Sequence, residues 1–238
     1  MQQQFSAIPE ITKNLIIING LVFLSAMAFP ILDHYLALFP IMSTHFQPYQ
    51  IVTHMFMHGS VTHIFFNMFT LFMFGTEIER AFGAKKFLFF YLSTGLGAAF
   101  LHSVIHYFEA SQLMQGIEPE MVNTIVREGR GIILQGMNYS SEPAATLNRL
   151  INIPVVGASG AVFGLLAAFG MLYPNRVIYL IIPPIPLKAK YFVIIFGLFE
   201  LYLGISNAQT GIAHFAHLGG ALFGFLIVLY WRRQGERF

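Results

Sequence analysis

Gly157-Ala158-Ser159-Gly160 opens an apolar stretch that continues to Gly170. It places a serine hydroxyl at the start of a segment that is apolar enough to lie in lipid. A second apolar stretch, further along the chain, opens with Ala216-His217-Leu218-Gly219-Gly220. A serine in one segment and a histidine in another, each beside glycines, predict nucleophilic serine chemistry inside a bilayer.

The composition is that of a membrane protein. Of the 238 residues, 56% are hydrophobic and 10% are charged, and the mean hydropathy is +0.65. A soluble domain is about 25% charged, so we expect a chain that crosses the bilayer several times. The lack of cysteine excludes disulfides, thiolate catalysis and Cys-ligated metals. The sequence has no basic tract that would indicate a nucleic-acid partner.

The hydropathy pattern predicts an all-α bundle of six membrane-spanning helices, forming a single domain over residues 1–238. A helix needs about 20 apolar residues to cross the hydrocarbon core. The spans are expected at about 13–30, 60–78, 87–106, 155–173, 190–206 and 212–231.

The longest polar segment, residues 107–152, is expected to form an outer loop inserted between the third and fourth spans. A short helix is predicted from Glu120 to Arg130, broken by the glycines at 129, 131 and 136. Loops of this length are often functional, but no residue pattern in this one indicates a ligand.

Basic residues predict the orientation, because cytoplasmic loops carry an excess of Lys and Arg. With the N-terminus inside, ten basic residues fall on the cytoplasmic side and three fall outside. The ten are Lys13, Arg80, Lys85, Lys86, Arg176, Lys188, Lys190, Arg232, Arg233 and Arg237, and the three are Arg127, Arg130 and Arg149. This excess predicts that both termini are cytoplasmic.

The first span has a second interpretation, as a signal peptide. Lys13 precedes an apolar stretch, and Ala26-Met27-Ala28 resembles a cleavage site. Glu10 and the single lysine make a poor basic region, so we favour a retained span. Basic inner loops, a short chain and the lack of an organelle targeting segment favour the inner membrane of a bacterium as its location.

Four polar residues are predicted to lie at one depth. The second, fourth and sixth spans run from outside to inside. Ser159, His217, His63 and Asn67 fall early in these spans, within roughly 5–12 Å of the outer boundary at about 1.5 Å per helical residue. At that depth a neutral imidazole can take the proton of a serine hydroxyl. The Ser159 backbone N–H, the Asn67 amide and His63 are candidate donors to an oxyanion.

Glycine spacing indicates which spans pack together. Gly160 and Gly164 are four residues apart, as are Gly220 and Gly224. Stripes of small residues let helix backbones approach closely in lipid. Packing of the fourth span on the sixth would therefore bring Ser159 toward His217.

Three motifs resemble those of the rhomboid family of intramembrane serine proteases. The nucleophile motif is Gly157-Ala158-Ser159-Gly160. The second-span motif is His58-Gly59-Ser60-Val61-Thr62-His63-Ile64-Phe65-Phe66-Asn67, and the base motif is Ala216-His217-Leu218-Gly219-Gly220-Ala221-Leu222-Phe223-Gly224. The resemblance covers the six spans and not the outer loop.

The resemblance implies a catalytic dyad of Ser159 and His217 with no essential carboxylate and no cofactor. It implies an oxyanion hole of His63, Asn67 and the Ser159 amide, supported by Gly157, Gly160, Phe163 and Gly220. It also implies that the partners are the lipid bilayer and single-span membrane proteins, whose helices would enter beside the second and fifth spans. Glu79-Arg80 and Gly83 match a structural turn of the family.

Two positions depart from the family pattern. Phe163 stands where a tyrosine is frequent, which keeps a ring against the imidazole but loses its hydroxyl. Tyr49-Gln50 stands where the first outer loop commonly has Trp-Arg, so the details of that loop are not predicted.

The nine histidines raise the alternative of a metal site. His54 and His58 are four residues apart, as are His102 and His106, and His214 precedes His217 by three. A zinc hydrolase needs three or four convergent ligands and typically a glutamate base in HExxH, which is absent. We therefore predict no metal. His102 and His106 are expected at the outer interface, and His54, His58 and His214 are expected to form hydrogen bonds within the bundle.

Glu200 lies inside the fifth span, where a carboxylate is costly and a functional role is the default hypothesis. Its depth is close to that of His217, so a third catalytic member and a structural or gating role both stay open. The dyad implied by the family favours the structural or gating role, for which a protonated carboxyl also stays open.

Two functions of other classes compete with proteolysis. A proteolytically inactive relative would bind membrane clients, but such relatives lack the serine or the histidine, and both are present here. A small transporter would also use intramembrane His, Asn and Glu, but it typically shows inverted repeats and interrupted helices, and we find neither in the sequence.

Overall fold

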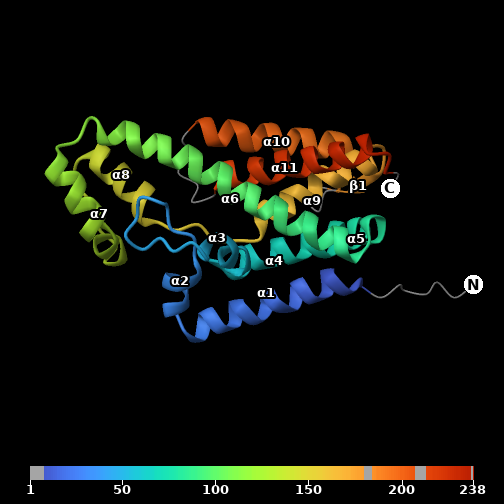
Figure 1. Cartoon of the computed structure of the whole chain (residues 1–238), viewed down its shortest axis with the longest axis horizontal. Coiled ribbons are helices and arrows are strands. Elements are labelled where there is room, and N and C mark those ends of the chain that lie inside the picture. Colours follow the sequence, from blue (N-terminus) through green and yellow to red (C-terminus); the bar gives the residue numbers. More distant parts are fainter. Residues whose placement is uncertain (1–7, 180–183, 207–212, 237) are drawn as a thin grey trace, which may run out of the picture.

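The computed structural model describes residues 8–179, 184–206, 213–236 and 238. Over these residues the chain forms an all-α membrane bundle, as predicted (Figure 1). The helices are α1 (Glu10–Ala28), α2 (Ile31–Leu36), α3 (Gln50–Thr53), η1 (His54–Phe56), α4 (Val61–Thr70), η2 (Leu71–Gly75), α5 (Thr76–Phe82), α6 (Ala84–Met114), α7 (Pro119–Leu134), α8 (Glu142–Asn152), α9 (Ser159–Leu172), α10 (Ala189–Ile205) and α11 (His214–Arg233).

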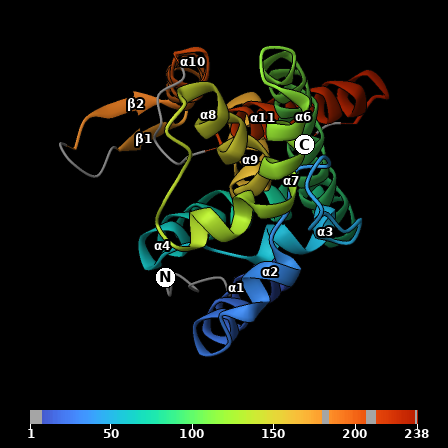
Figure 2. The ribbon, with the colours of Figure 1, turned by 90° about the vertical axis from the view of Figure 1, so that its left-hand side faces the viewer.

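One small sheet was not predicted. Strands β1 (Val177–Tyr179) and β2 (Pro186–Lys188) pair antiparallel between α9 and α10. This hairpin projects from the side of the bundle (Figure 2).

Each predicted span overlaps a helix. Among the described residues, four helical stretches are long and apolar enough to cross a membrane, namely α1, the continuous helix Val61–Phe82, α6 and α11. The predicted span 155–173 is too long, because α9 begins only at Ser159 and has 14 residues. At about 1.5 Å per residue, α9 is shorter than the hydrocarbon core of about 30 Å. The number of spans and their orientation stay predictions.

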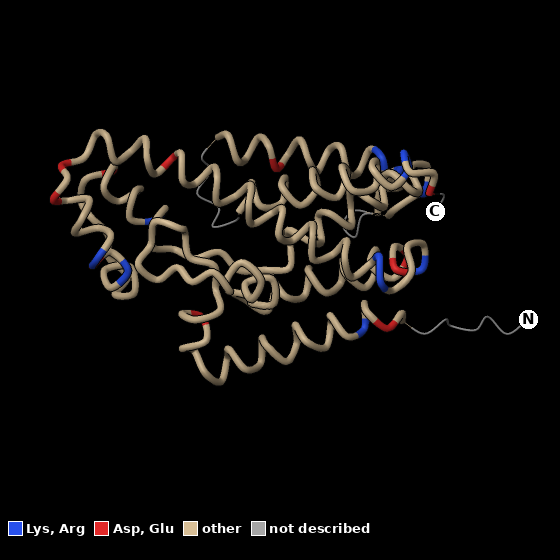
Figure 3. The backbone as a smooth tube through the Cα atoms, in the orientation of Figure 1, with Lys and Arg blue, Asp and Glu red and all other residues tan. Residues whose placement is uncertain are grey.

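Charged residues lie at the two ends of the bundle. Figure 3 shows Lys and Arg where α5 and α11 end, and again along α7, with few charges between. This separation matches the division of basic residues on which the predicted orientation rests.

Three helices meet along the predicted glycine stripes. A Cβ added at Gly220 would collide with the carbonyl oxygen of Gly160, and one at Gly224 would lie 2.8 Å from Gly164 Cα. A Cβ at Gly160 would collide with Ala98 of α6. Because only glycine permits this approach, the stripes pack α9 against α11 and α6. The prediction that the fourth span packs on the sixth is confirmed.

A buried carboxylate fastens α1 to the bundle. Glu79 of α5 accepts hydrogen bonds from the backbone N–H groups of Ile11 and Thr12, at 2.9 and 2.7 Å, and from the Thr12 hydroxyl at 2.7 Å. The first N–H groups of a helix have no intrahelical acceptor and attract a negative charge. Gly83, with φ of +75°, then ends α5 and starts α6.

Residues 107–152 are not a loop, which corrects the prediction. α6 continues to Met114, and α7 and α8 fill most of the remainder. Apolar side chains from all three helices form a second core: Ala110, Ile125, Ala144, Leu147 and Ile151. Overall hydropathy underestimates how much of this segment is helical and packed, because its apolar residues occupy only one face of each helix.

The sequence predicted that the glycines at 129 and 131 would break this helix. That prediction is wrong, because both lie inside α7. A Cβ at Gly129 would lie 2.6 Å from the amide nitrogen of Asn152 and would collide with the side chain of Asn148, so this glycine lets α7 cross α8. Gly136, with φ of +74°, does lie beyond the end of the helix.

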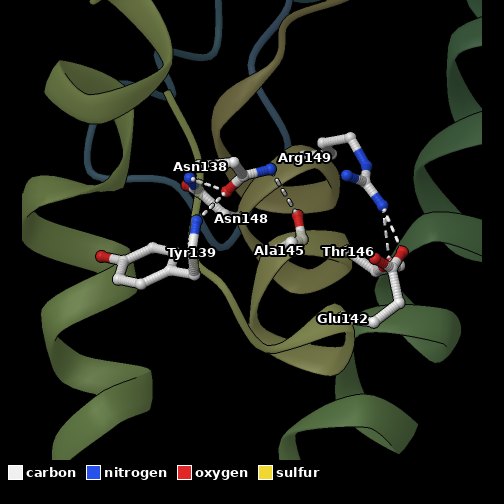
Figure 4. Close-up of polar contacts among 7 residues, drawn as sticks. All are labelled: Asn138, Tyr139, Glu142, Ala145, Thr146, Asn148 and Arg149. Atoms are coloured by element: carbon white, nitrogen blue, oxygen red, sulfur yellow. Dashed lines mark hydrogen bonds and ion pairs between the residues drawn. The ribbon is translucent and has the colours of Figure 1, made fainter. Parts of the chain in front are cut away.

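Polar contacts order α8 and the turn before it (Figure 4). Asn138 accepts a hydrogen bond from Asn148 at 2.9 Å and donates one to the carbonyl of Ala145 at 3.1 Å. Glu142 accepts from Arg149 at 2.9 Å, and this bond, with a second from Thr146, lowers the pKa of the Glu142 carboxyl.

We expect Gly220→Ala to lower the free energy of unfolding by about 2 kcal/mol, because overpacking a close contact typically costs 1–3 kcal/mol. Thermal or denaturant unfolding in detergent measures the change. Gly20→Ala is the matched control, since a Cβ there meets nothing within 4 Å. It should leave stability unchanged or raise it by up to about 1 kcal/mol. Equal stability of the two variants would contradict the packing argument.

Candidate active site

The backbone before Ser159 is held in place from two sides. The N–H and carbonyl of Val155 pair with Leu38, and the N–H of Gly157 donates to the carbonyl of His54 at 2.9 Å. Gly157 has φ of +131°, a conformation that side chains rarely allow. The chain therefore stays non-helical up to this point, and Ser159 becomes the first residue of α9.

Ser159 and His217 are in hydrogen-bond contact. His217 lies in the first turn of α11, and its Nε2 atom is 2.9 Å from Ser159 Oγ. The close approach of Gly160 and Gly220 holds the two helices at the separation that this contact requires. His217 is buried and Ser159 is partly buried.

Phe163 fixes the plane of the imidazole. Its ring stacks on His217 with centroids 4.2 Å apart and planes 7° from parallel. Phe163 is one helical turn after Ser159 on α9, so the nucleophile and this ring come from the same face. A tyrosine hydroxyl is not needed for the stacking.

A carboxylate lies behind the imidazole. Glu200 Oε2 is 3.0 Å from Nδ1 of His217 and 2.7 Å from Nδ1 of His214. When Glu200 is ionised, its carboxylate only accepts hydrogen bonds, and both Nδ1 atoms then act as donors. A neutral His217 then has no proton on Nε2, the atom that faces Ser159. Sequence reasoning noticed Glu200 but did not assign it to this place.

The three candidate oxyanion donors, His63, Asn67 and the Ser159 N–H, differ in their surroundings. A Cβ at Gly157 would lie 2.8 Å from Cε1 and Nε2 of His63, so this ring borders the loop that leads to Ser159. Asn67 is buried, and its amide donates to the His63 carbonyl at 3.0 Å. The Ser159 N–H belongs to the first turn of α9, where N–H groups lack intrahelical acceptors.

Glu200, His214 and His217 also place three potential ligand atoms within 4.8 Å of one another. Zinc ligands lie about 2.0–2.2 Å from the metal, so tetrahedral ligands are separated by about 3.3 Å. The contacts of 2.7 and 3.0 Å are those of hydrogen bonds instead. The distances thus favour a hydrogen-bonded cluster, and the absence of a metal stays a prediction.

Other histidines only partly match the expectations. His54 forms the expected hydrogen bond, from Nδ1 to the Gln50 carbonyl at 2.9 Å. For His58, which is buried, the expected hydrogen bond stays a prediction, because within the described residues its ring nitrogens show no partner in hydrogen-bond geometry. His102 is buried, and its ring centroid is 3.9 Å from that of His106, whereas the depth of the two residues in the membrane stays a prediction.

Gln50 organises the segment between α1 and α4. Its side-chain oxygen accepts from the N–H groups of Phe39 and Gln47, and its nitrogen donates to the carbonyls of Tyr35 and His45. Gln50 is fully buried. An amide with four backbone contacts therefore stands where the family commonly has arginine.

Comparison with known proteins identifies relatives of this chain. The family model described as Rhomboid domain matches residues 45–234. Rhomboid protease AarA of Providencia stuartii is 30% identical over 177 residues, which cover 73% of this chain and 52% of that protein. RHOMBOID-like protein 12, mitochondrial, of Arabidopsis thaliana is 29% identical over 175 residues, covering 72% and 43%.

A third relative, Putative rhomboid protease YdcA of Bacillus subtilis (strain 168), is 25% identical over 191 residues. The match covers 79% of this chain and 70% of that protein. The chain thus spans about half of the first two relatives and more of this one.

We expect Gly157→Ala to slow the reaction of Ser159 with a fluorophosphonate about tenfold. The new Cβ would press on His63 and strain the backbone, which typically costs 1–3 kcal/mol, and the strain would move Ser159 away from His217. The measurement is the second-order labelling rate in detergent. Gly131→Ala, where a Cβ meets nothing within 4 Å, should label at the parent rate. An unchanged rate for Gly157→Ala would contradict this role of the loop.

Proposed function

Because the chain belongs to the rhomboid family, we propose that it is an intramembrane serine endopeptidase with Ser159 as nucleophile and His217 as general base. The observation that carries the proposal is the 2.9 Å contact between Ser159 Oγ and His217 Nε2. A serine hydroxyl is a weak nucleophile until a base within this distance accepts its proton.

The proposed reaction proceeds in two steps. Ser159 Oγ attacks the scissile carbonyl while its proton passes to His217 Nε2. The imidazolium then protonates the leaving amine, which yields an acyl-enzyme. In the second step His217 takes a proton from water as the water oxygen attacks the acyl group. The imidazolium then returns that proton to Ser159 Oγ as the acyl–oxygen bond breaks, which releases the acid product and restores both residues. No cofactor takes part.

Oxyanion stabilisation is assigned to the N-terminus of α9 and to His63. The Ser159 N–H and the positive end of the α9 dipole lie beside the nucleophile. His63 borders the same loop through Gly157. Asn67 can contribute because its amide has a second N–H beyond the one bound to the His63 carbonyl.

The proposed substrates are membrane proteins with a single spanning helix. Hydrolysis needs an extended peptide, so helix segments that unwind easily are favoured. The chain is an integral membrane protein, and we place it in a bacterial inner membrane with both termini in the cytoplasm. The basic residues support this orientation. The bacterial location is the less supported part of the proposal, because the relatives include proteins named as mitochondrial.

The client-binding alternative requires no reactive serine, and neither does a transporter. The stacked, hydrogen-bonded His217 favours the protease, because binding alone does not need a base beside a hydroxyl. Reaction with a serine-directed fluorophosphonate that is lost in Ser159→Ala separates the protease from both alternatives.

We expect Ser159→Ala and His217→Ala each to reduce cleavage of a tagged single-span substrate by at least about 10⁴-fold, since loss of the nucleophile or base has effects of this size or more. Detergent or vesicle assays resolve the products. Ser25→Ala is the matched control, because Ser25 is exposed on α1 and bonds only its own helix at Leu21. Full cleavage by Ser159→Ala would overturn the proposed function.

A further inference from the structure

The geometry points to Glu200 as a positioning residue that extends the dyad to a Ser159–His217–Glu200 relay, with His214 as a second donor to the same carboxylate. This inference rests on the proposed function and deepens it. It revises the expectation, drawn from the family resemblance, that no carboxylate matters.

Glu200 is the one acidic residue within α10, a helix that otherwise exposes apolar side chains. Only Ala189 and Glu200 are buried among the residues of α10. Glu200 is 6% exposed, which makes an isolated charge there costly. Two N–H groups on Oε2 offset that cost, so α10 is oriented with this side chain toward α11.

The carboxylate determines which nitrogen of His217 carries the proton. Because Nδ1 donates to Glu200, neutral His217 has its lone pair on Nε2, 2.9 Å from Ser159 Oγ. The opposite tautomer would present an N–H to the hydroxyl and could not accept its proton. Glu200 thus selects the tautomer that the reaction needs.

The same contact stabilises the charge that forms during catalysis. When Oγ attacks the substrate, its proton moves to Nε2 while Nδ1 keeps its own proton. His217 becomes an imidazolium whose Nδ1–H points at the Glu200 carboxylate, which stays ionised throughout. A charge-assisted hydrogen bond of this kind is roughly twice as strong as a neutral one.

His214 orients the carboxylate. It precedes His217 on α11, and its Nδ1 reaches Oε2 at 2.7 Å, the shorter of the two contacts. One oxygen of Glu200 is therefore bound by two imidazoles from the same helix. This arrangement restricts the carboxylate more than His217 alone would.

A purely structural role makes a different prediction. If Glu200 only fastens α10 to α11, its loss would impair the entry of large membrane substrates and would raise KM. If Glu200 positions His217, its loss would also slow reactions that need no movement of α10. A small fluorophosphonate reports on Ser159 and His217 alone, so it distinguishes these roles.

The test compares Glu200→Gln with the parent protein. We expect kcat for a single-span substrate and the fluorophosphonate labelling rate to fall together, by about 10²- to 10⁴-fold. A neutral amide in place of the equivalent carboxylate of a serine protease costs about 10⁴-fold. KM should stay within about twofold. A labelling rate within twofold of the parent rate would overturn the relay, as would a defect confined to KM.

Gly204→Ala is the matched control for the α10–α11 contact. Its Cβ would lie 3.1 Å from the Phe215 ring and 3.5 Å from His214 Cβ, which disturbs the helix contact without removing the carboxylate. Its labelling rate should stay within about threefold of the parent rate. A loss equal to that of Glu200→Gln would assign the effect to helix packing and overturn the relay.

A measurement on the parent protein does not depend on the folding of any variant. In ¹⁵N-histidine-labelled protein, NMR should show the His217 proton on Nδ1, with a downfield signal typical of a bond to a carboxylate. A proton on Nε2 would overturn the relay. Cleavage by Ser159→Ala would instead overturn the proposed function, so the two failures are distinguishable.

Discussion

The site depends on the contact between the backbones of α9 and α11. Gly220 and Gly224 meet Gly160 and Gly164 with no side chain between them. Lipid is as apolar as a leucine side chain, so helices in a bilayer gain little from burying apolar groups and depend on close packing instead. The glycines that stabilise the pair of helices also determine the distance from serine to imidazole. Stability and chemistry therefore share one set of residues.

Features that depend on local pattern could be predicted from the sequence. Spans follow from hydropathy, and the packing of α9 on α11 follows from glycines four residues apart. The start of α9 could not be predicted, because the extended backbone at Val155 depends on its pairing with Leu38, which is distant in the chain. Gly129 was misjudged for a related reason, since its effect on α7 depends on what α8 places opposite it.

The contacts of the polar residues in the site could not be predicted from the sequence either. Sequence position gives the depth of Asn67 and Glu200 but not the rotation of their helices. Asn67 lies one turn after His63 and binds the carbonyl of that residue, a contact that any amide in a helix can make. An ionised Glu200 carboxylate cannot donate such a bond to a carbonyl of its own helix, so it needs donors on a neighbouring helix. The sequence showed that a carboxylate at position 200 would need hydrogen-bond donors, whereas only the structure identified these donors as His214 and His217.

The position of Glu200 couples the base to the placement of α10. α10 packs the partly buried Phe192 and Val193 on the core, and two hydrogen bonds to one oxygen of the buried Glu200 add a polar contact with α11. Any displacement of α10 that breaks these bonds leaves His217 stacked on Phe163 but free to exchange its proton between the two nitrogens. Stacking fixes the plane of the ring, whereas only a charged acceptor fixes its tautomer. In the proposed relay, an active base therefore requires α10 to be in place, and the carboxylate in this apolar helix is the group that sets the requirement.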